Sequence, residues 1–120
     1  MAKLLSVLFV SVLISASDAA SGFLLKCDVG TLGYYASSRL LANCGTPKKI
    51  FTLDMNYCLE NSEGVLWQKR GGMFRISCKN CYFKLNDKFC CTCNVPYDEP
   101  MNTCINLDDV IGFKNGMLYC

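Results

Sequence analysis

The sequence predicts an all-β domain built from two copies of one unit, roughly 50 residues each, and held together by disulfides. The first observation is an internal repeat, because residues 53–68 return without a gap as residues 105–120. The second is an even count of ten cysteines, all at or after position 27. The third is the spacing of apolar residues, which alternates with the two-residue period of strands and shows no long helical period.

The repeat keeps its apolar positions while its polar positions vary. This is expected of a packing unit that buries its apolar face against its own copy. The equivalent pairs are Leu53 and Ile105, Met55 and Leu107, Leu59 and Ile111, Gly64 and Gly116, Leu66 and Leu118, and Trp67 and Tyr119. We expect all of these pairs, including Trp67 and Tyr119, to serve packing.

Residues 1–20 have the pattern of a secretory signal peptide. Lys3 precedes an apolar run over residues 4–14, and small residues follow, which places cleavage near Ala19 or Ala20. The apolar run is well short of the roughly 18 residues that span a bilayer. We therefore expect a secreted, extracellular protein without membrane insertion, whose mature domain covers residues 21–120.

Charge and cysteine content narrow the function classes. The formal net charge of +2 gives no indication of a nucleic-acid or membrane binder. Cysteines in even number in a secreted chain indicate an oxidising compartment and a disulfide framework. The absence of histidine from the sequence removes the usual catalytic base, so no enzyme is predicted.

The predicted elements follow in chain order. Alternation predicts a strand at residues 40–44, and a hairpin over residues 74–93 that turns at residues 86–88. Within each repeat, short polar residues suit the cap of a helical turn, namely Asp54 and Asn56 in the first copy and Asn106 and Asp108 in the second. Tight turns at Glu63-Gly64 and Asn115-Gly116 then lead into closing strands at residues 65–67 and 117–119.

These patterns together resemble the cyanovirin-N homologue family of lectins over residues 23–120. The resemblance rests on these groups of residues: Cys78, Asn80 and Phe83; Leu40, Ala42 and Cys44; Gly71, Gly72 and Phe74 before Cys78; Leu53, Asp54 and Asn56; residues 105–109; Glu60, Asn61, Glu63 and Gly64; and Asn115, Gly116 and Leu118.

The resemblance implies a cyanovirin-N-like, pseudo-symmetric fold with repeats at about residues 23–77 and 78–120. Each half would hold a three-stranded sheet, a β-hairpin and short helical turns, with strands exchanged between the repeats. Such a protein would be a monomer or a domain-swapped dimer. Its partners would be oligosaccharides or glycoprotein glycans of the high-mannose type, bound through α1,2-linked mannose without a metal or other cofactor.

The same resemblance implies two sugar sites. The residues of the better site are Glu60, Asn61, Glu63, Gly72, Ser77 and Asn94. Met73 and the pair Val95-Pro96 depart there from the more polar residues usual in the family. The residues of a second, weaker site are Lys26, Gly45, Thr46 and Asn115, with Phe113 where the family usually has asparagine.

The resemblance also implies the disulfides Cys27–Cys44 and Cys78–Cys93. In an antiparallel hairpin closed by the latter bond, Cys81 would lie opposite Cys90, so this pair is expected to be bonded as well. For the remaining four cysteines, Cys91–Cys104 and Cys58–Cys120 are one possible pairing, since the sequence alone does not fix connectivity.

Two other interpretations of the cysteines are weaker. A zinc site at Cys78, Cys81, Cys91 and Cys93 is disfavoured in a secreted chain without histidine. A redox pair at Cys78 and Cys81 would lie in a strand pattern, without a helix start to stabilise the thiolate. The alternative function is a cysteine-rich secreted interaction, effector or defence protein that uses the lectin scaffold on a protein or cell-surface target.

Overall fold

The computed structural model describes residues 20–120, so the expected signal peptide lies outside the described residues apart from Ala20. The strands in this range are β1 (Gly33–Tyr35), β2 (Arg39–Cys44), β3 (Lys49–Asp54), β4 (Leu59–Ser62), β5 (Val65–Gln68), β6 (Cys78–Lys84), β7 (Lys88–Val95), β8 (Asp98–Asn106), β9 (Gly112–Lys114) and β10 (Met117–Tyr119). The helical elements are the 3-10 turns η2 (Phe23–Leu25), η3 (Val29–Thr31), η4 (Met55–Tyr57), η5 (Phe74–Ile76) and η6 (Leu107–Asp109). Within residues 20–120, no helix has the length and apolar character of a membrane span.

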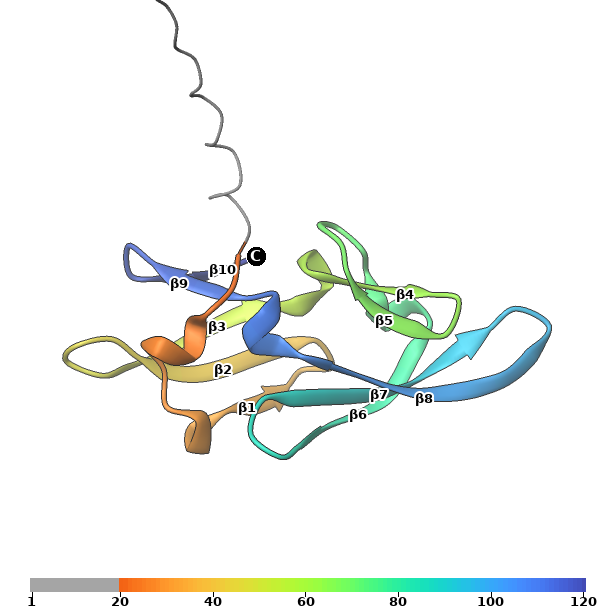
Figure 1. Cartoon of the computed structure of the whole chain (residues 1–120), viewed down its shortest axis with the longest axis horizontal. Helices are drawn as coiled ribbons and strands as arrows, with labels where there is room; N and C mark the ends of the chain where they lie inside the picture. Colours follow the sequence, from red (N-terminus) through yellow and green to blue (C-terminus); the bar gives the residue numbers. More distant parts are fainter. Residues whose placement is uncertain (1–19) are drawn as a thin grey trace, which may run out of the picture.

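The strands form two three-stranded antiparallel sheets and two hairpins, which confirms the predicted all-β, two-repeat fold. One sheet has the order β1-β2-β3 and the other β6-β7-β8, while β4 pairs with β5 and β9 with β10. Each half of the sequence therefore supplies one sheet and one hairpin (Figure 1).

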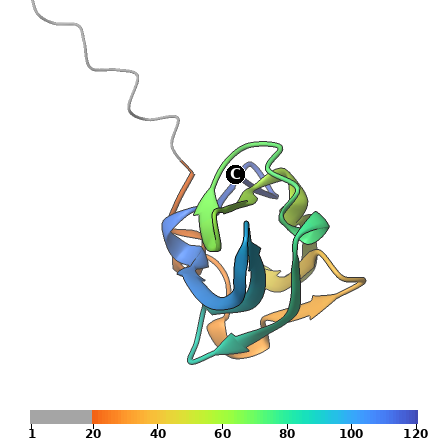
Figure 2. The same cartoon turned by 90° about the vertical axis from the view of Figure 1, so that its right-hand side faces the viewer.

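Each hairpin packs on the sheet of the other half. Strand β5 lies against β7 and β8, and β10 lies against β3. In Figure 2 the green β4–β5 hairpin arches over the blue β7–β8 hairpin. At this contact the buried backbone N–H of Leu66 donates to the hydroxyl of Thr103 at 3.0 Å. At the other, the rings of Phe51 and Phe113 meet edge to face with centroids 5.0 Å apart. The exchange explains why neither repeat can bury its apolar face alone.

The repeated apolar residues form the core, as predicted. Met55, Leu107, Leu59 and Ile111 are fully buried, and Leu66 and Leu118 nearly so. The expectation for Trp67 is wrong, because its side chain is 60% exposed. Successive side chains of a strand point to opposite faces, so the inward position of Leu66 in β5 forces Trp67 outward.

The helical turns appear where the polar caps predict them, with one difference between the copies. In η4 the Asp54 carboxylate accepts a hydrogen bond from the Asn56 backbone N–H at 3.0 Å. In η6 the Asn106 side chain makes no such bond. There the backbone N–H of Asp108 donates to the carboxylate of Asp87 at 2.8 Å, so a residue from the β6–β7 turn replaces the local cap.

The strand expected from residue 74 begins instead at Cys78. The backbone of Met73 is left-handed, with φ of 51°, and Phe74–Ile76 form η5. The side-chain oxygen of Asn56 accepts from the Arg75 N–H at 3.1 Å, which ties this turn to η4. Phe74 is thereby buried, whereas Ile76 is 79% exposed.

All ten cysteines are paired. The disulfides Cys27–Cys44, Cys58–Cys120 and Cys78–Cys93 are present as expected. The expected pairs Cys81–Cys90 and Cys91–Cys104 are wrong, because Cys81 is bonded to Cys91 and Cys90 to Cys104.

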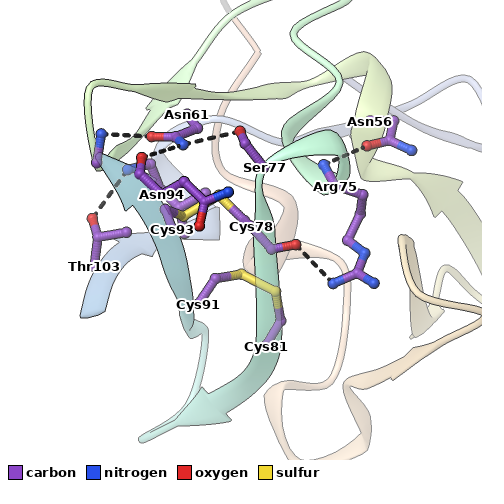
Figure 3. Close-up of a disulfide and its surroundings, with 12 residues drawn as sticks. Asn56, Asn61, Arg75, Ser77, Cys78, Cys81, Cys91, Cys93, Asn94 and Thr103 are labelled. Atoms are coloured by element: carbon purple, nitrogen blue, oxygen red, sulfur yellow. Dashed lines mark hydrogen bonds between the residues drawn. A yellow bond between two sulfur atoms is a disulfide. The ribbon is translucent and has the colours of Figure 1, made fainter. Parts of the chain in front are cut away.

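The error comes from a β-bulge in β6. Counting along an unbroken hairpin places Cys81 opposite Cys90. The register instead shifts after Lys79, so that Tyr82 lies opposite Cys90 and Cys81 bonds to Cys91 (Figure 3). A bulge inserts one extra residue into a strand, and a shift of one residue changes every partner beyond it.

The corrected pairs attach β7 covalently to both of its neighbours. Cys90 lies directly opposite Cys104 of β8, while Cys91 is bonded to β6. The end of β7, which carries Asn94, is fixed to β6 by the adjacent Cys78–Cys93 bond.

Candidate functional site

The better predicted site is an open depression of about 400 Å³ beside the turn between β4 and β5. Four of the six predicted residues line it, together with the departing pair Val95-Pro96: Asn61, Glu63, Ser77, Asn94, Val95 and Pro96. The other departure, Met73, does not line it. They come from the β4–β5 hairpin, the link between η5 and β6, and the end of β7. Segments from both halves of the chain thus meet here.

The side chain of Asn61 connects these segments. Its Nδ2 donates to the Ser77 hydroxyl at 2.9 Å and to the Asn94 carbonyl at 2.8 Å (Figure 3). Its Oδ1 accepts from the Gly64 N–H at 2.6 Å. Both amide hydrogens and the carbonyl are therefore engaged within the protein, which makes Asn61 a positioning residue.

Three other polar groups face the depression with capacity for a ligand. The Ser77 hydroxyl accepts from Asn61 and keeps its own hydrogen to donate. Asn94 is exposed, and within residues 20–120 its side-chain amide forms no hydrogen bond, since its N–H and carbonyl contacts all use the backbone. Glu63 is exposed at the hairpin turn and offers a carboxylate. A donor-acceptor hydroxyl, an amide and a carboxylate are the groups needed to bind sugar hydroxyls.

The turn itself is held by a close approach. Glu63 and Gly64 both have positive φ, at 53° and 95°. A Cβ on Gly64 would lie 2.6 Å from the Val95 side chain and 3.0 Å from the Met101 sulfur, so only glycine lets β4–β5 approach β7–β8 this closely.

The remaining two predicted residues lie elsewhere. Glu60 precedes Asn61 in β4, so its side chain points to the opposite face of the hairpin. Gly72 packs against that region, where a Cβ would lie 2.4 Å from the Leu59 carbonyl oxygen and 2.6 Å from the Glu60 Cβ. The structure therefore gives Gly72 a packing role and does not bring Glu60 into the depression.

A smaller hollow of about 150 Å³ adjoins the first depression at Ser77 and Asn94. It adds Arg75, Ile76 and Lys79, which the sequence analysis does not include. The Arg75 guanidinium donates to the Cys78 carbonyl at 2.9 Å, so it is held in place at this edge. These residues lie within two positions of Ser77 in the sequence, which could have marked them as part of the site. A strand at residues 74–78 would not bring Arg75 and Ile76 to one hollow, whereas the turn η5 does.

All four residues of the second predicted site line one depression of about 450 Å³, which is shared with two further residues: Lys26, Gly45, Thr46, Phe113, Lys114 and Asn115. A neighbouring hollow of about 310 Å³ shares Gly45, Thr46 and Phe113 with it and extends toward Lys49 and Phe51. The β9–β10 turn of this site and the β4–β5 turn of the first lie toward opposite ends of the molecule (Figure 1).

Phe113 does not fill the second depression. Its ring packs edge to face on Phe51 and lies about 3.9 Å from where a Cβ on Gly45 would be. Gly45 has φ of 92°, so it permits both the turn and the contact with the ring. The ring is only partly exposed and forms an apolar surface beside the polar groups.

The described residues 20–120 contain no group of three or more His, Cys, Asp or Glu side chains that could hold a metal ion. The residues that line the two depressions offer hydrogen-bonding groups, charges and apolar surfaces.

A family model for the CVNH domain matches residues 23–119. Among solved structures, a MoCVNH3 variant in complex with (N-GlcNAc)4 is similar with a TM-score of 0.72 and 16% identity, over 85% of this chain and 98% of that one. GzCVNH of Gibberella zeae has a TM-score of 0.68 and 23% identity, over 82% and 95% of the two chains. Microvirin in complex with mannobiose has a TM-score of 0.66 and 24% identity, over 82% and 97%. A comparison with curated proteins finds no match.

Proposed function

Because the chain belongs to the CVNH domain family, which consists of lectins and not of enzymes, we propose that it is a secreted lectin for mannose-type glycans. The proposed ligand is α1,2-linked mannose of high-mannose chains, bound without a metal. The observation that supports this most is the convergence of Glu63, Ser77 and Asn94 on one depression, from segments far apart in the sequence.

The geometry suits a neutral sugar. A sugar hydroxyl can both donate and accept a hydrogen bond. The Asn94 side-chain amide can accept through its oxygen and donate through its nitrogen, and the Ser77 hydroxyl can donate. Val95 and Pro96 supply an apolar wall for the C–H face of a sugar ring. The fixed Asn61 bonds hold Ser77 and Asn94 in place before a ligand arrives, which lowers the entropic cost of binding.

The similar solved structures guide the choice of sugars. The microvirin complex with mannobiose supports mannobiose as the first ligand to test. The MoCVNH3 variant complex makes an N-acetylglucosamine oligomer the natural comparison ligand. The five disulfides support export to an oxidising compartment. Export itself can be tested by expressing the full chain in a eukaryotic secretory host and locating the product.

The test is an NMR titration of the mature domain with α1,2-linked mannobiose. We expect the amide signals of Ser77 and Asn94 to shift in a saturable way. Asn94→Ala and Glu63→Gln should each weaken binding about fivefold to tenfold, since a hydrogen bond contributes on the order of 1 kcal/mol. Asn102→Ala, at an exposed position of β8 outside the depression, is the matched control and should bind like the unaltered domain.

The proposal fails if mannobiose shifts no signal at this depression, or if the control weakens binding as much as Asn94→Ala does. Because a single depression for a neutral sugar binds weakly, a multivalent glycan surface should bind more tightly than the disaccharide when both depressions are functional.

The alternative is a secreted interaction, effector or defence protein that binds a protein or cell-surface target. It is favoured by two exposed apolar side chains, Ile76 at 79% in the hollow that adjoins the first depression, and Met73 at 43% just before the turn η5. A glycan array without response, together with binding to a cell-surface protein that free mannose does not compete, would establish this function instead.

A further inference from the structure

The two depressions differ in charge. The first has the carboxylate of Glu63 on its lining, and its neighbouring hollow adds the cations Arg75 and Lys79, so opposite charges are mixed there. The second is lined by Lys26 and Lys114, and the hollow that adjoins it is lined by Lys49. Within the part of the chain that the structure describes, no carboxylate lines the second depression or the hollow that adjoins it.

The cation at Lys26 is carried on a fixed backbone. The Lys26 carbonyl accepts from the Gly45 N–H at 3.0 Å and from the Lys48 ammonium at 3.3 Å, and the Lys26 N–H donates to Phe23 at 3.0 Å. These bonds hold the start of the Lys26 side chain at the rim of the depression, next to the turn that carries Thr46.

Within residues 20–120, the charges of Lys26 and Lys49 are not neutralised by an ion pair. Lys48 forms an ion pair with Asp28 at 3.0 Å. Neither Lys26 nor Lys49 has a carboxylate partner within ion-pair distance in that range. Lys114 does not bring its charge to this surface: its ammonium lies 5.6 Å from the centroid of the Tyr119 ring, on the face of the β9–β10 hairpin opposite to Phe113.

The rest of the lining suits a saccharide. The Phe113 ring offers an apolar face to the C–H side of a sugar, and Thr46 and Asn115 offer polar groups beside it. Lys26 lies at the rim, and Lys49 shares the face of β3 that carries Phe51, on which Phe113 packs. Their ammonium groups are compact point charges that bind carboxylate or sulfate oxygens. An anionic group on a sugar ring seated over Phe113 would thus meet two cations and no repelling carboxylate of the lining.

We propose that the second depression binds an anionic saccharide, one that carries a carboxylate or a sulfate, in preference to a neutral sugar. This inference rests on the proposed lectin function for the presence of a sugar site and adds its ligand class. The two ends of the molecule then differ in ligand, with a neutral mannose-type sugar at the first depression and an acidic sugar at the second.

The experiment is an NMR titration at low ionic strength, in which the amides of Gly45 and Asn115 report on the second depression and those of Ser77 and Asn94 on the first. The probes are a uronic-acid disaccharide, a sulfated N-acetylglucosamine, their neutral counterparts, and inorganic sulfate alone. We expect the acidic sugars to bind at Gly45 and Asn115 roughly threefold to tenfold more tightly than the neutral ones, as two exposed charge pairs allow. The comparison of the uronic acid with the sulfated sugar identifies which anion is preferred.

Variants make the assignment specific. Lys26→Gln removes one charge without touching the backbone bonds of that residue, and should lower the preference for acidic over neutral sugars about threefold. The double variant that adds Lys49→Gln should abolish the preference. Lys26→Arg should retain the preference. Lys84→Gln, an exposed lysine at the end of β6 outside every depression described above, is the matched control for net charge and should change nothing at Gly45.

Three results would overturn the proposal: equal affinity for acidic and neutral sugars, an equal loss in the Lys84→Gln control, or shifts with inorganic sulfate at the same affinity as with the sulfated sugar. The last result would show simple ion binding without saccharide recognition. Failure of mannobiose at Ser77 and Asn94 would count against the proposed function and leave the Gly45 and Asn115 result to be judged separately.

Discussion

Replacement of Asn61 by alanine separates a positioning role from a ligand-binding role. The family pattern makes Asn61 a sugar-binding residue, but the structure uses its amide inside the protein. The side chain joins three backbone or side-chain groups, at Gly64, Ser77 and Asn94, over 2.6 to 2.9 Å. Asn61→Ala removes all three bonds at once.

The expected cost follows from the surroundings of the partners. Each hydrogen bond contributes a net of about 1 kcal/mol. Gly64 is buried, so its N–H would be left without a partner, which costs about 1 to 3 kcal/mol. Asn94 is exposed, so water can replace Asn61 at its carbonyl. We therefore expect Asn61→Ala to lower the free energy of unfolding by about 2 to 4 kcal/mol.

The assay is urea denaturation at equilibrium with the disulfides intact, followed by the fluorescence of Trp67. In a domain of this size, each kcal/mol lowers the melting temperature by about 4 to 8 °C, so thermal melting gives an independent reading. Asn61→Asp keeps the acceptor for Gly64 and loses the two donated bonds, and should fall between alanine and the unaltered domain.

Asn94→Ala is the matched control. Its side chain makes no hydrogen bond within residues 20–120, and Asn61 contacts only its backbone carbonyl. We expect a change below about 0.5 kcal/mol in stability, as for an ordinary surface substitution, together with weaker sugar binding. The reasoning is refuted if Asn61→Ala is as stable as the unaltered domain, or if the two variants lose equal stability.

Two further substitutions test the packing that shapes the site. Gly72→Ala places a Cβ 2.4 Å from the Leu59 carbonyl oxygen and should destabilise the domain by about 1 to 3 kcal/mol, measured by thermal melting. Gly30→Ala is the control, because Gly30 lies in open space without a positive φ, and it should be nearly neutral. Thr103→Val removes the only side-chain acceptor that the buried Leu66 N–H has within residues 20–120. It should lower the free energy of unfolding, measured by urea denaturation, by about 1 to 3 kcal/mol. A loss below about 0.5 kcal/mol would show that this bond does not hold the hairpin on β8.

Much of the first site could be predicted because the residues lie at turns. Glu63 and Gly64 form a turn whose chemistry is local, and the cap at Asp54 needs only residues two positions apart. The role of Asn61 could not be predicted, because its partners Ser77 and Asn94 come from other elements.

The errors share a physical cause. The wrong pairings of Cys81 and Cys91 arose from a bulge that one left-handed residue, Asn80, places in the strand. The strand expected at Phe74 gave way to a 3-10 turn held by Asn56 of the earlier turn η4. In both cases a local pattern of alternation was overridden by a backbone conformation or a long-range hydrogen bond that alternation does not encode.

The sequence by itself determined the two-repeat all-β fold, the buried residues and the turns, because apolar spacing and turn chemistry act over a few residues. The tertiary structure alone decided which hairpin covers which sheet, which cysteines bond, and that the amide of Asn61 is occupied by Ser77 and Asn94. These depend on distances between segments far apart in the chain, and such distances are set only when both repeats pack together.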